Sequence, residues 1–219
     1  AICMASRAQY MTGLYEFSTG CNFDRENLSY ELWEQSYPEI LHQSGYITGF
    51  AGKFGFRVDE PEGKGSIETV KNSFDWWSGW LGQGSYDISK NKEAEEYIKR
   101  YGKQAEHTTY ALGLMGQDFV RTYGASETPF CLSISFKAPH TPYSTDARYD
   151  NAFEGREFTE PGNYGGSEKL PAHLKAGRPF DKGKSWLKDY QGSMSKYHQM
   201  VHGVDVAVGM VIEELQKLG

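Results

Sequence analysis

The side chains with the clearest chemical potential lie at the start of the chain, where Cys3 precedes Arg7. Between them stands Ser6, a residue type that caps helices, and the pattern predicts a short helix that begins at Arg7 and closes at Thr12-Gly13. Free N–H groups at a helix N-terminus favour an anion by about 0.3–1 kcal/mol. An arginine adds a positively charged guanidinium group that can donate two parallel hydrogen bonds to an anion. The segment therefore predicts an anion-binding turn with a thiol beside it.

Two further groups of polar side chains follow predicted strands. Lys53 comes just after the apolar run 46–51, and His140 stands between two prolines after the strand predicted over 129–136. The prolines hold the backbone, so His140 can donate a hydrogen bond or a proton to a leaving oxygen. Lys137 leaves the same strand. Open α/β sheets bind their ligands at the C-terminal ends of their strands, which favours a site there.

Each of these side chains, taken alone, has a simpler structural interpretation. Cys3 would be a small buried hydrophobe, Arg7 an ordinary surface ion pair and Lys53 a solvated charge. The three cysteines, Cys3, Cys21 and Cys131, form neither a disulfide framework nor a zinc-site spacing. A catalytic role for Cys3, Arg7 and Lys53 is favoured only when the three are considered together with the residues around them.

The elements that must position these groups alternate between helix and strand. A helix is predicted to begin at the cap residue Ser36 and to end at Gly45, before the first strand. A second helix is predicted over 108–123. The strand over 129–136 has apolar residues at both parities, which predicts burial on both faces. This succession predicts an α/β layer structure.

Three other segments complete the predicted organisation. Residues 58–92 are predicted to form an ordered surface excursion over the core edge, whose tryptophans suit either packing or a carbohydrate, and residues 151–184 a loop. A last helix is predicted to end at Gly219. Its apolar stripe is predicted to be core packing and consists of Tyr190, Met194, Tyr197, Val201, Val204, Val208, Val211 and Leu215.

Composition narrows the class of protein. The 219 residues are 38% hydrophobic and carry a formal net charge of -6 without a basic block, which argues against a nucleic-acid surface. No apolar run approaches the roughly 20 residues of a membrane-spanning helix. A globular domain without nucleic acid or a membrane span is predicted.

The run from Cys3 to Gly13 resembles the signature of the type I sulfatases. In that signature Cys is followed by any residue, Pro or Ala, Ser and Arg, and Thr-Gly closes the segment. A maturase oxidises the Cys of that family to Cα-formylglycine. The resemblance implies that Cys3 is a precursor nucleophile and that Arg7 stabilises charge beside it. Ala5 stands where Pro is commoner, which leaves the type of maturase open.

Two further segments resemble the same family. Residues 45–53 are similar to its second signature, which implies that Lys53 binds the sulfate oxygens and the formylglycine side chain. Residues 138–142 are similar to its small-Pro-His-x-Pro turn, which implies that His140 contacts the sulfate ester. Lys137 is carried over as a substrate-binding residue.

The chain departs from the family pattern in two respects. Gly55 stands where the family often has a His two residues after the Lys. The family's divalent cation, usually calcium, is held mainly by acidic pairs before the Cys motif and after the last helix. The resemblance therefore implies that the formylglycine of Cys3 supplies one metal ligand and that the others lie outside the chain. Residues 1–219 are predicted to be the central part of a catalytic domain, inactive by themselves.

The resemblance implies an α/β fold of the alkaline phosphatase and sulfatase type, with a mostly parallel sheet flanked by helices on both faces and here incomplete. It implies hydrolysis of a sulfate monoester, on a small molecule or a glycan, in a periplasmic, extracellular or lysosomal protein. Two alternatives stay open. One is a phosphonate monoester or phosphodiester hydrolase of the same superfamily, and the other is a non-catalytic, truncated homologue.

Overall fold

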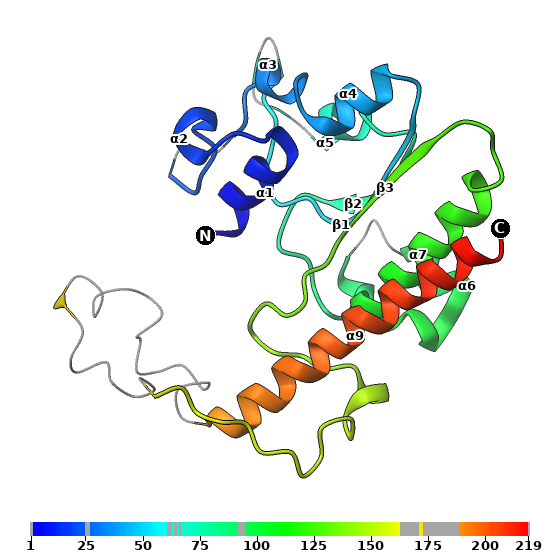
Figure 1. Cartoon of the computed structure of the whole chain (residues 1–219). Coiled ribbons are helices and arrows are strands. Elements are labelled where there is room, and N and C mark those ends of the chain that lie inside the picture. Colours follow the sequence, from blue (N-terminus) through cyan, green and yellow to red (C-terminus); the bar gives the residue numbers. More distant parts are fainter. Residues whose placement is uncertain are drawn as a thin grey trace. The chain divides into compact units, whose positions relative to one another are not determined.

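The computed structural model describes residues 2–24, 27–60, 63, 65, 67–91, 95–162, 171–172 and 189–218 (Figure 1). The chain divides into two compact units. Unit 1 comprises residues 1–137 and 204–219, unit 2 comprises residues 138–203, and each is described by itself. No helix in the described ranges is both long and apolar enough to cross a membrane.

Unit 1 is built on three parallel strands. β1 (Ile47–Lys53) lies between β2 (Trp76–Trp80) and β3 (Phe130–Ser135). In the register of the sheet, Gly52 of β1 stands opposite Gly79 of β2 and Ser135 of β3. All three strands therefore end at one edge, and the predicted parallel sheet is confirmed.

Helices cover both faces of this sheet, as predicted. Figure 1 shows α1 (Cys3–Thr12) and α4 (Tyr37–Gln43) on one side of the strands and α7 (Thr108–Tyr123) on the other. Adjacent residues of β1 point to opposite faces, so Phe50 joins the core beneath α1 while Ala51 joins the core beneath α7. Both side chains are fully buried.

Most remaining elements are short. Between α1 and α4 lie α2 (Glu16–Thr19) and α3 (Tyr30–Trp33), and α5 (Ile67–Lys71) precedes β2. Between β2 and α7 lie η1 (Ile88–Lys90), α6 (Glu95–Tyr101) and η3 (Gly102–Ala105).

The helix ends agree with the predictions in part. α7 has the predicted bounds, and Gly45 follows α4 with a φ of 84° that favours glycine. Ser36 precedes α4, but its side chain makes no capping hydrogen bond. The prediction that Ser6 caps the first helix is wrong. α1 begins at Cys3, and the Ser6 amide donates to the Ile2 carbonyl at 2.9 Å within the first turn.

The predicted surface excursion over 58–92 is wrong, because its described part contributes a strand and core residues. β2 pairs with β1 along its whole length, and Trp80 is 4% exposed. Trp77 stacks on Phe50 with ring centroids 5.2 Å apart, and Trp76 packs edge-on against Phe119. These tryptophans are packing residues, which supports the structural one of their two predicted roles.

Two predictions of burial are also wrong. All six residues of β3 are only partly buried, because β3 pairs with β1 alone among the described strands. Much of the predicted core stripe of α9 (Tyr190–Gln216) is exposed, Val208 by 40% and Leu215 by 39%. Val211 of the predicted stripe is buried and faces α7, and Ala207, which the stripe did not include, packs there as well, where glycines permit close packing. The predicted end at Gly219 lies outside the described residues.

Unit 2 contains η4 (Ala147–Tyr149) and the first part of α9. Its described residues include an aromatic cluster in which His198 stacks on Phe158 at 4.4 Å, while His202 meets Tyr149 edge-on. The loop predicted over 151–184 is irregular where it is described, up to residue 162, and most of the rest lies outside the described residues.

Candidate active site

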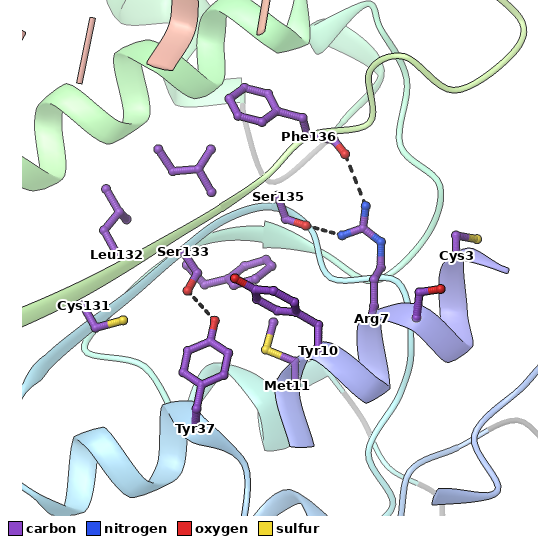
Figure 2. Close-up of a pocket in the computed structure, with 13 residues that line it drawn as sticks. Cys3, Arg7, Tyr10, Met11, Tyr37, Cys131, Leu132, Ser133, Ser135 and Phe136 are labelled. Atoms are coloured by element: carbon purple, nitrogen blue, oxygen red, sulfur yellow. Dashed lines mark hydrogen bonds between the residues drawn. The ribbon is translucent and has the colours of Figure 1, made fainter. Parts of the chain in front are cut away.

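The described part of unit 1 places four of the predicted site residues around the edge where its three strands end. Cys3 and Arg7 stand on successive turns of α1, and Figure 2 shows the Arg7 side chain extending from the helix toward the end of β3. Lys53 is the last residue of β1, and Lys137 follows β3 by two residues. Open α/β sheets bind ligands at such an edge.

Arg7 ties α1 to the ends of two strands. Its Nη1 donates to the Lys53 carbonyl at 2.6 Å and also to the Ser135 hydroxyl, and its Nη2 donates to the Phe136 carbonyl at 3.2 Å (Figure 2). Burial lowers the pKa of Arg7, and the nearby Cys3 opposes this shift. Arg7 therefore carries a charge near Cys3 while it fixes the helix that presents that residue.

Lys53 is buried, with 3% of its surface exposed, and it lies close enough to Cys3 for the two groups to interact electrostatically. Its ammonium group donates to the Gln83 side-chain oxygen and lies near the side chain of Cys3. Burial lowers the pKa of Lys53, Cys3 opposes this shift and Arg7 adds to it. A cation and the predicted nucleophile precursor thus lie near one another, although 50 positions separate Cys3 from Lys53.

Lys137 brings a third positive charge to the same place. It is 8% exposed, and its Nζ lies 3.4 Å from the Gln83 carbonyl and 5.1 Å from the centre of the Tyr86 ring. Burial lowers the pKa of Lys137, and the charge of Lys53 lowers it further. The two ammonium groups are therefore close enough to repel one another electrostatically.

None of the ion pairs among the described residues includes Arg7, Lys53 or Lys137. Buried charges normally have a counter-charge, because removing an ion from water costs several kcal/mol. The arrangement of these three cations around Cys3 is that of a site for an anionic group. We call Arg7, Lys53 and Lys137 the cationic centre.

Gly55 is required by this arrangement. Its φ is 91°, and a Cβ there would lie 2.7 Å from Arg7 Cδ and 3.3 Å from Lys53 Cε. The family's common His at this position would therefore collide with the Arg7 side chain. A side chain at position 55 would therefore require the Arg7 side chain to shift.

A cavity of about 650 Å³ lies beside the cationic centre. It is lined by Cys3, Arg7 and Tyr10 of α1, by Tyr37, and by six successive residues, 131–136, along β3 (Figure 2). On its wall the Tyr37 hydroxyl and the Ser133 hydroxyl are 2.5 Å apart. Side chains from both faces of β3 line it, so it follows the free edge of that strand.

His140 belongs to unit 2, so its predicted place beside Cys3 stays a prediction. It is exposed, and its Nδ1 contacts the Thr141 carbonyl. A carbonyl oxygen can only accept a hydrogen bond, so Nδ1 is the donor in this contact.

The described residues do not fit a calcium ion. They contain no group of three or more His, Cys, Asp or Glu side chains arranged to hold a metal. A calcium ion needs about six to eight oxygen ligands, whereas the charged side chains near Cys3, Arg7 and Lys53, are positive.

Sequence reasoning missed Gln83, which contacts both lysines, and Ser135, which binds Arg7. Both stand at or just after the end of a strand. Gln83 lies in the loop after β2, so it could have been identified only if β2 had been predicted as a strand. The sequence gives no such signal, because the short Trp76–Trp80 segment does not alternate between apolar and polar residues.

A family model described as Sulfatase matches residues 1–219. The chain belongs to the sulfatase family. The human N-acetylglucosamine-6-sulfatase is 30% identical over 233 residues, which cover 100% of this chain and 41% of the relative. An N-acetylglucosamine-6-O-sulfatase of Bacteroides thetaiotaomicron is 26% identical over 164 residues. The match covers 72% of this chain and 26% of the relative. This sulfatase chain thus spans less than half of the curated relatives it matches.

Solved structures agree with the fold. A phosphonate monoester hydrolase of Agrobacterium radiobacter has a TM-score of 0.70 at 16% identity, and the match covers 100% of this chain and 51% of that protein. A protein in complex with its substrate D-glucosamine-2-N,6-O-disulfate has a TM-score of 0.64 at 20% identity, with coverage of 100% and 53%. These likenesses confirm the α/β fold, and this chain matches about half of each of the two proteins.

Proposed function

We propose that the protein containing this chain hydrolyses a sulfate monoester, with a formylglycine made from Cys3 as its nucleophile. The observation that carries the proposal is the cationic centre around Cys3, which has no ion-paired carboxylate among the described residues. A sulfate group supplies the missing negative charge. Family membership supports the same reaction class.

In the proposed reaction, water adds to the aldehyde of residue 3 and forms a gem-diol. One hydroxyl gives its proton to water as its oxygen attacks sulfur, and the bond between sulfur and the alcohol oxygen breaks. The alcohol leaves with a proton from the protonated imidazole of His140. The second hydroxyl then returns a proton to that imidazole, the carbon–oxygen bond to sulfate breaks, and the aldehyde is regenerated. Each turnover consumes one water and yields an alcohol and inorganic sulfate.

The chain's own residues prepare this reaction. Lys53 lies near residue 3 and would stabilise the negative charge that develops on the transferred group and on the hydrated aldehyde. Lys137 adds charge from the end of β3 and would bind the substrate. Arg7 holds α1 against the ends of β1 and β3 through its hydrogen bonds to the Lys53 and Phe136 carbonyls. No step is assigned to calcium, because the described residues do not fit that ion.

The proposed substrate is a sulfated sugar, which follows from the names of the relatives. Two further relatives, from Drosophila melanogaster and Caenorhabditis elegans, are named as extracellular sulfatases or their homologues. They support an extracellular location for the parent protein. A formylglycine-generating maturase is the required partner.

The test compares an aryl sulfate with an aryl phosphonate monoester, using full-length protein co-expressed with a maturase. We expect a higher kcat/KM for the sulfate and loss of both activities in Cys3→Ala. A higher kcat/KM for the phosphonate would favour the alternative hydrolase. No activity on either ester, in protein shown to contain formylglycine, would favour the non-catalytic homologue.

A further inference from the structure

Gln83 joins the two buried lysines of the site through two different groups. Its side-chain oxygen accepts a hydrogen bond from Lys53 Nζ, while its backbone carbonyl lies 3.4 Å from Lys137 Nζ. Lys53 extends from the end of β1 and Lys137 from the end of β3. One residue in the loop after β2 thus contacts the cations presented by both other strands.

The loop that carries Gln83 is held close to the end of β1. The Phe54 amide donates to the Trp80 carbonyl at 2.8 Å, and the Gly55 amide donates to the Leu81 carbonyl at 3.1 Å. These backbone bonds extend the pairing of β1 with β2 beyond the strands. The position of Gln83 is therefore set by backbone structure as well as by its own side chain.

The contact with Lys53 fixes which way the Gln83 amide points. An ammonium group only donates, so the amide oxygen must face Lys53 and the amide nitrogen must point elsewhere. Gln83 is an exposed residue, and its Nε2 has no hydrogen-bond acceptor in the part of the chain that the structure describes. Two N–H donors are therefore available beside the cationic centre.

We infer that Gln83 holds Lys53 and Lys137 in place and donates an Nε2 hydrogen bond to an oxygen of the bound sulfate group. This inference rests on the proposed function, because it deepens the recognition of the same anion. A neutral amide suits this place. It satisfies an ammonium with its oxygen and an anion with its nitrogen, whereas a carboxylate would neutralise the lysine and repel the sulfate.

Two variants of the full-length, matured protein separate these roles. Gln83→Glu keeps an acceptor for Lys53 but replaces the donor with a negatively charged oxygen. Gln83→Met has a similar length and provides neither group. Gln216→Met changes an exposed glutamine at the end of α9 and is the matched control.

The first measurement is the binding of inorganic sulfate by calorimetric titration, which requires no turnover. A hydrogen bond to a charged group contributes enough that its loss weakens binding roughly 10- to 100-fold. We expect a loss of that size in Gln83→Met and a larger one in Gln83→Glu, with wild-type affinity in the control. Unchanged sulfate affinity in both Gln83 variants, or no sulfate binding by the unchanged protein, would overturn the inference.

The second measurement is the kinetics on an aryl sulfate. We expect Gln83→Glu to raise KM more than it lowers kcat, because its lysine contact is kept, and Gln83→Met to lower kcat as well. Equal effects of the two variants on KM and kcat would contradict the assigned roles. A wild-type protein that binds sulfate but does not hydrolyse the ester would refute the proposed function, while the affinities would still decide the role of Gln83.

Discussion

Unit 1 contains two groups of charged side chains that are organised in opposite ways. The cationic centre gathers Arg7, Lys53 and Lys137 around Cys3 without a carboxylate in an ion pair. The other group joins α7 to α9, where the Arg121 guanidinium donates two hydrogen bonds of 2.9 Å to the two oxygens of Glu214.

Each described cation of the α7–α9 group has an acidic partner. Lys217 pairs with Glu214 at 3.0 Å, and Asp118 accepts from Arg100 at 2.7 Å and from the Tyr101 hydroxyl at 2.7 Å. Hydrogen bonds from Arg121 and Lys217 lower the pKa of Glu214. This group stabilises a helix pair and leaves no charge for a ligand.

The difference separates charges that stabilise the fold from charges that bind. A paired surface charge contributes little and predicts no ligand. Buried cations without a counter-charge raise the free energy of the folded protein, and they are typical of sites that bind an anion. Removal of a charge should therefore have opposite consequences in the two places.

The largest expected effect is on activity, from Lys53→Met. We expect kcat/KM to fall by roughly 10²–10³-fold, because one preorganised donor to the developing charge is lost. The melting temperature should stay equal or rise, because a buried, unpaired ammonium is removed. The comparison uses kinetics on an aryl sulfate and thermal unfolding, with the exposed Lys103→Met as the control. A normal kcat/KM or a large loss of stability in Lys53→Met would show that Lys53 stabilises the fold, as the charges of the α7–α9 group do, and does not serve to bind an anion.

The next effect concerns the space that the cationic centre requires. Gly55→Ala adds a Cβ 2.7 Å from Arg7 Cδ at a residue with a φ of 91°, so we expect a loss of about 1–3 kcal/mol of stability and a lower kcat. Gly45→Ala is the matched control, because its φ is 84° and nothing lies within 4 Å of the added atom. Denaturant unfolding and kinetics measure both. Equal losses in the two variants would show that the Arg7 contact is unimportant.

The smallest effect is at the α7–α9 group. Arg121→Gln should lower the melting temperature by roughly 2–4 °C near neutral pH and leave kcat/KM unchanged. Hydrogen bonds with Arg121 and Lys217 lower the pKa of Glu214 from its ordinary 4.5, so its contribution is present above that pH and is lost as the pH falls through the lowered pKa. Melting curves of both proteins at a series of pH values should therefore converge in acid. A constant difference at all pH values would contradict this assignment.

The sequence predicted the elements whose signals are local. Apolar spacing and glycines predicted the bounds of α7 and the order of helix, Gly45 and strand before Lys53, and the structure confirms both. The helix over 3–12 was predicted too short, because Ser6 has a typical cap composition but lies one turn inside the helix.

Properties that depend on distant packing could not be predicted. Periodicity identified an apolar stripe on α9 that includes Val211, but it missed Ala207, which packs on α7 because Gly113 permits a close approach there. The motifs predicted Lys53 and Lys137 as site residues, whereas Gln83 became visible only when β2 was placed next to β1.

The central claim is that Cys3 becomes the nucleophile of a sulfatase. The most direct measurement is mass spectrometry of the peptide that contains residue 3, made on full-length protein co-expressed with a maturase and assayed on an aryl sulfate. We predict that formylglycine replaces cysteine and that the activity of a preparation rises in proportion to the converted fraction. Full activity in protein whose Cys3 is unmodified would contradict the account.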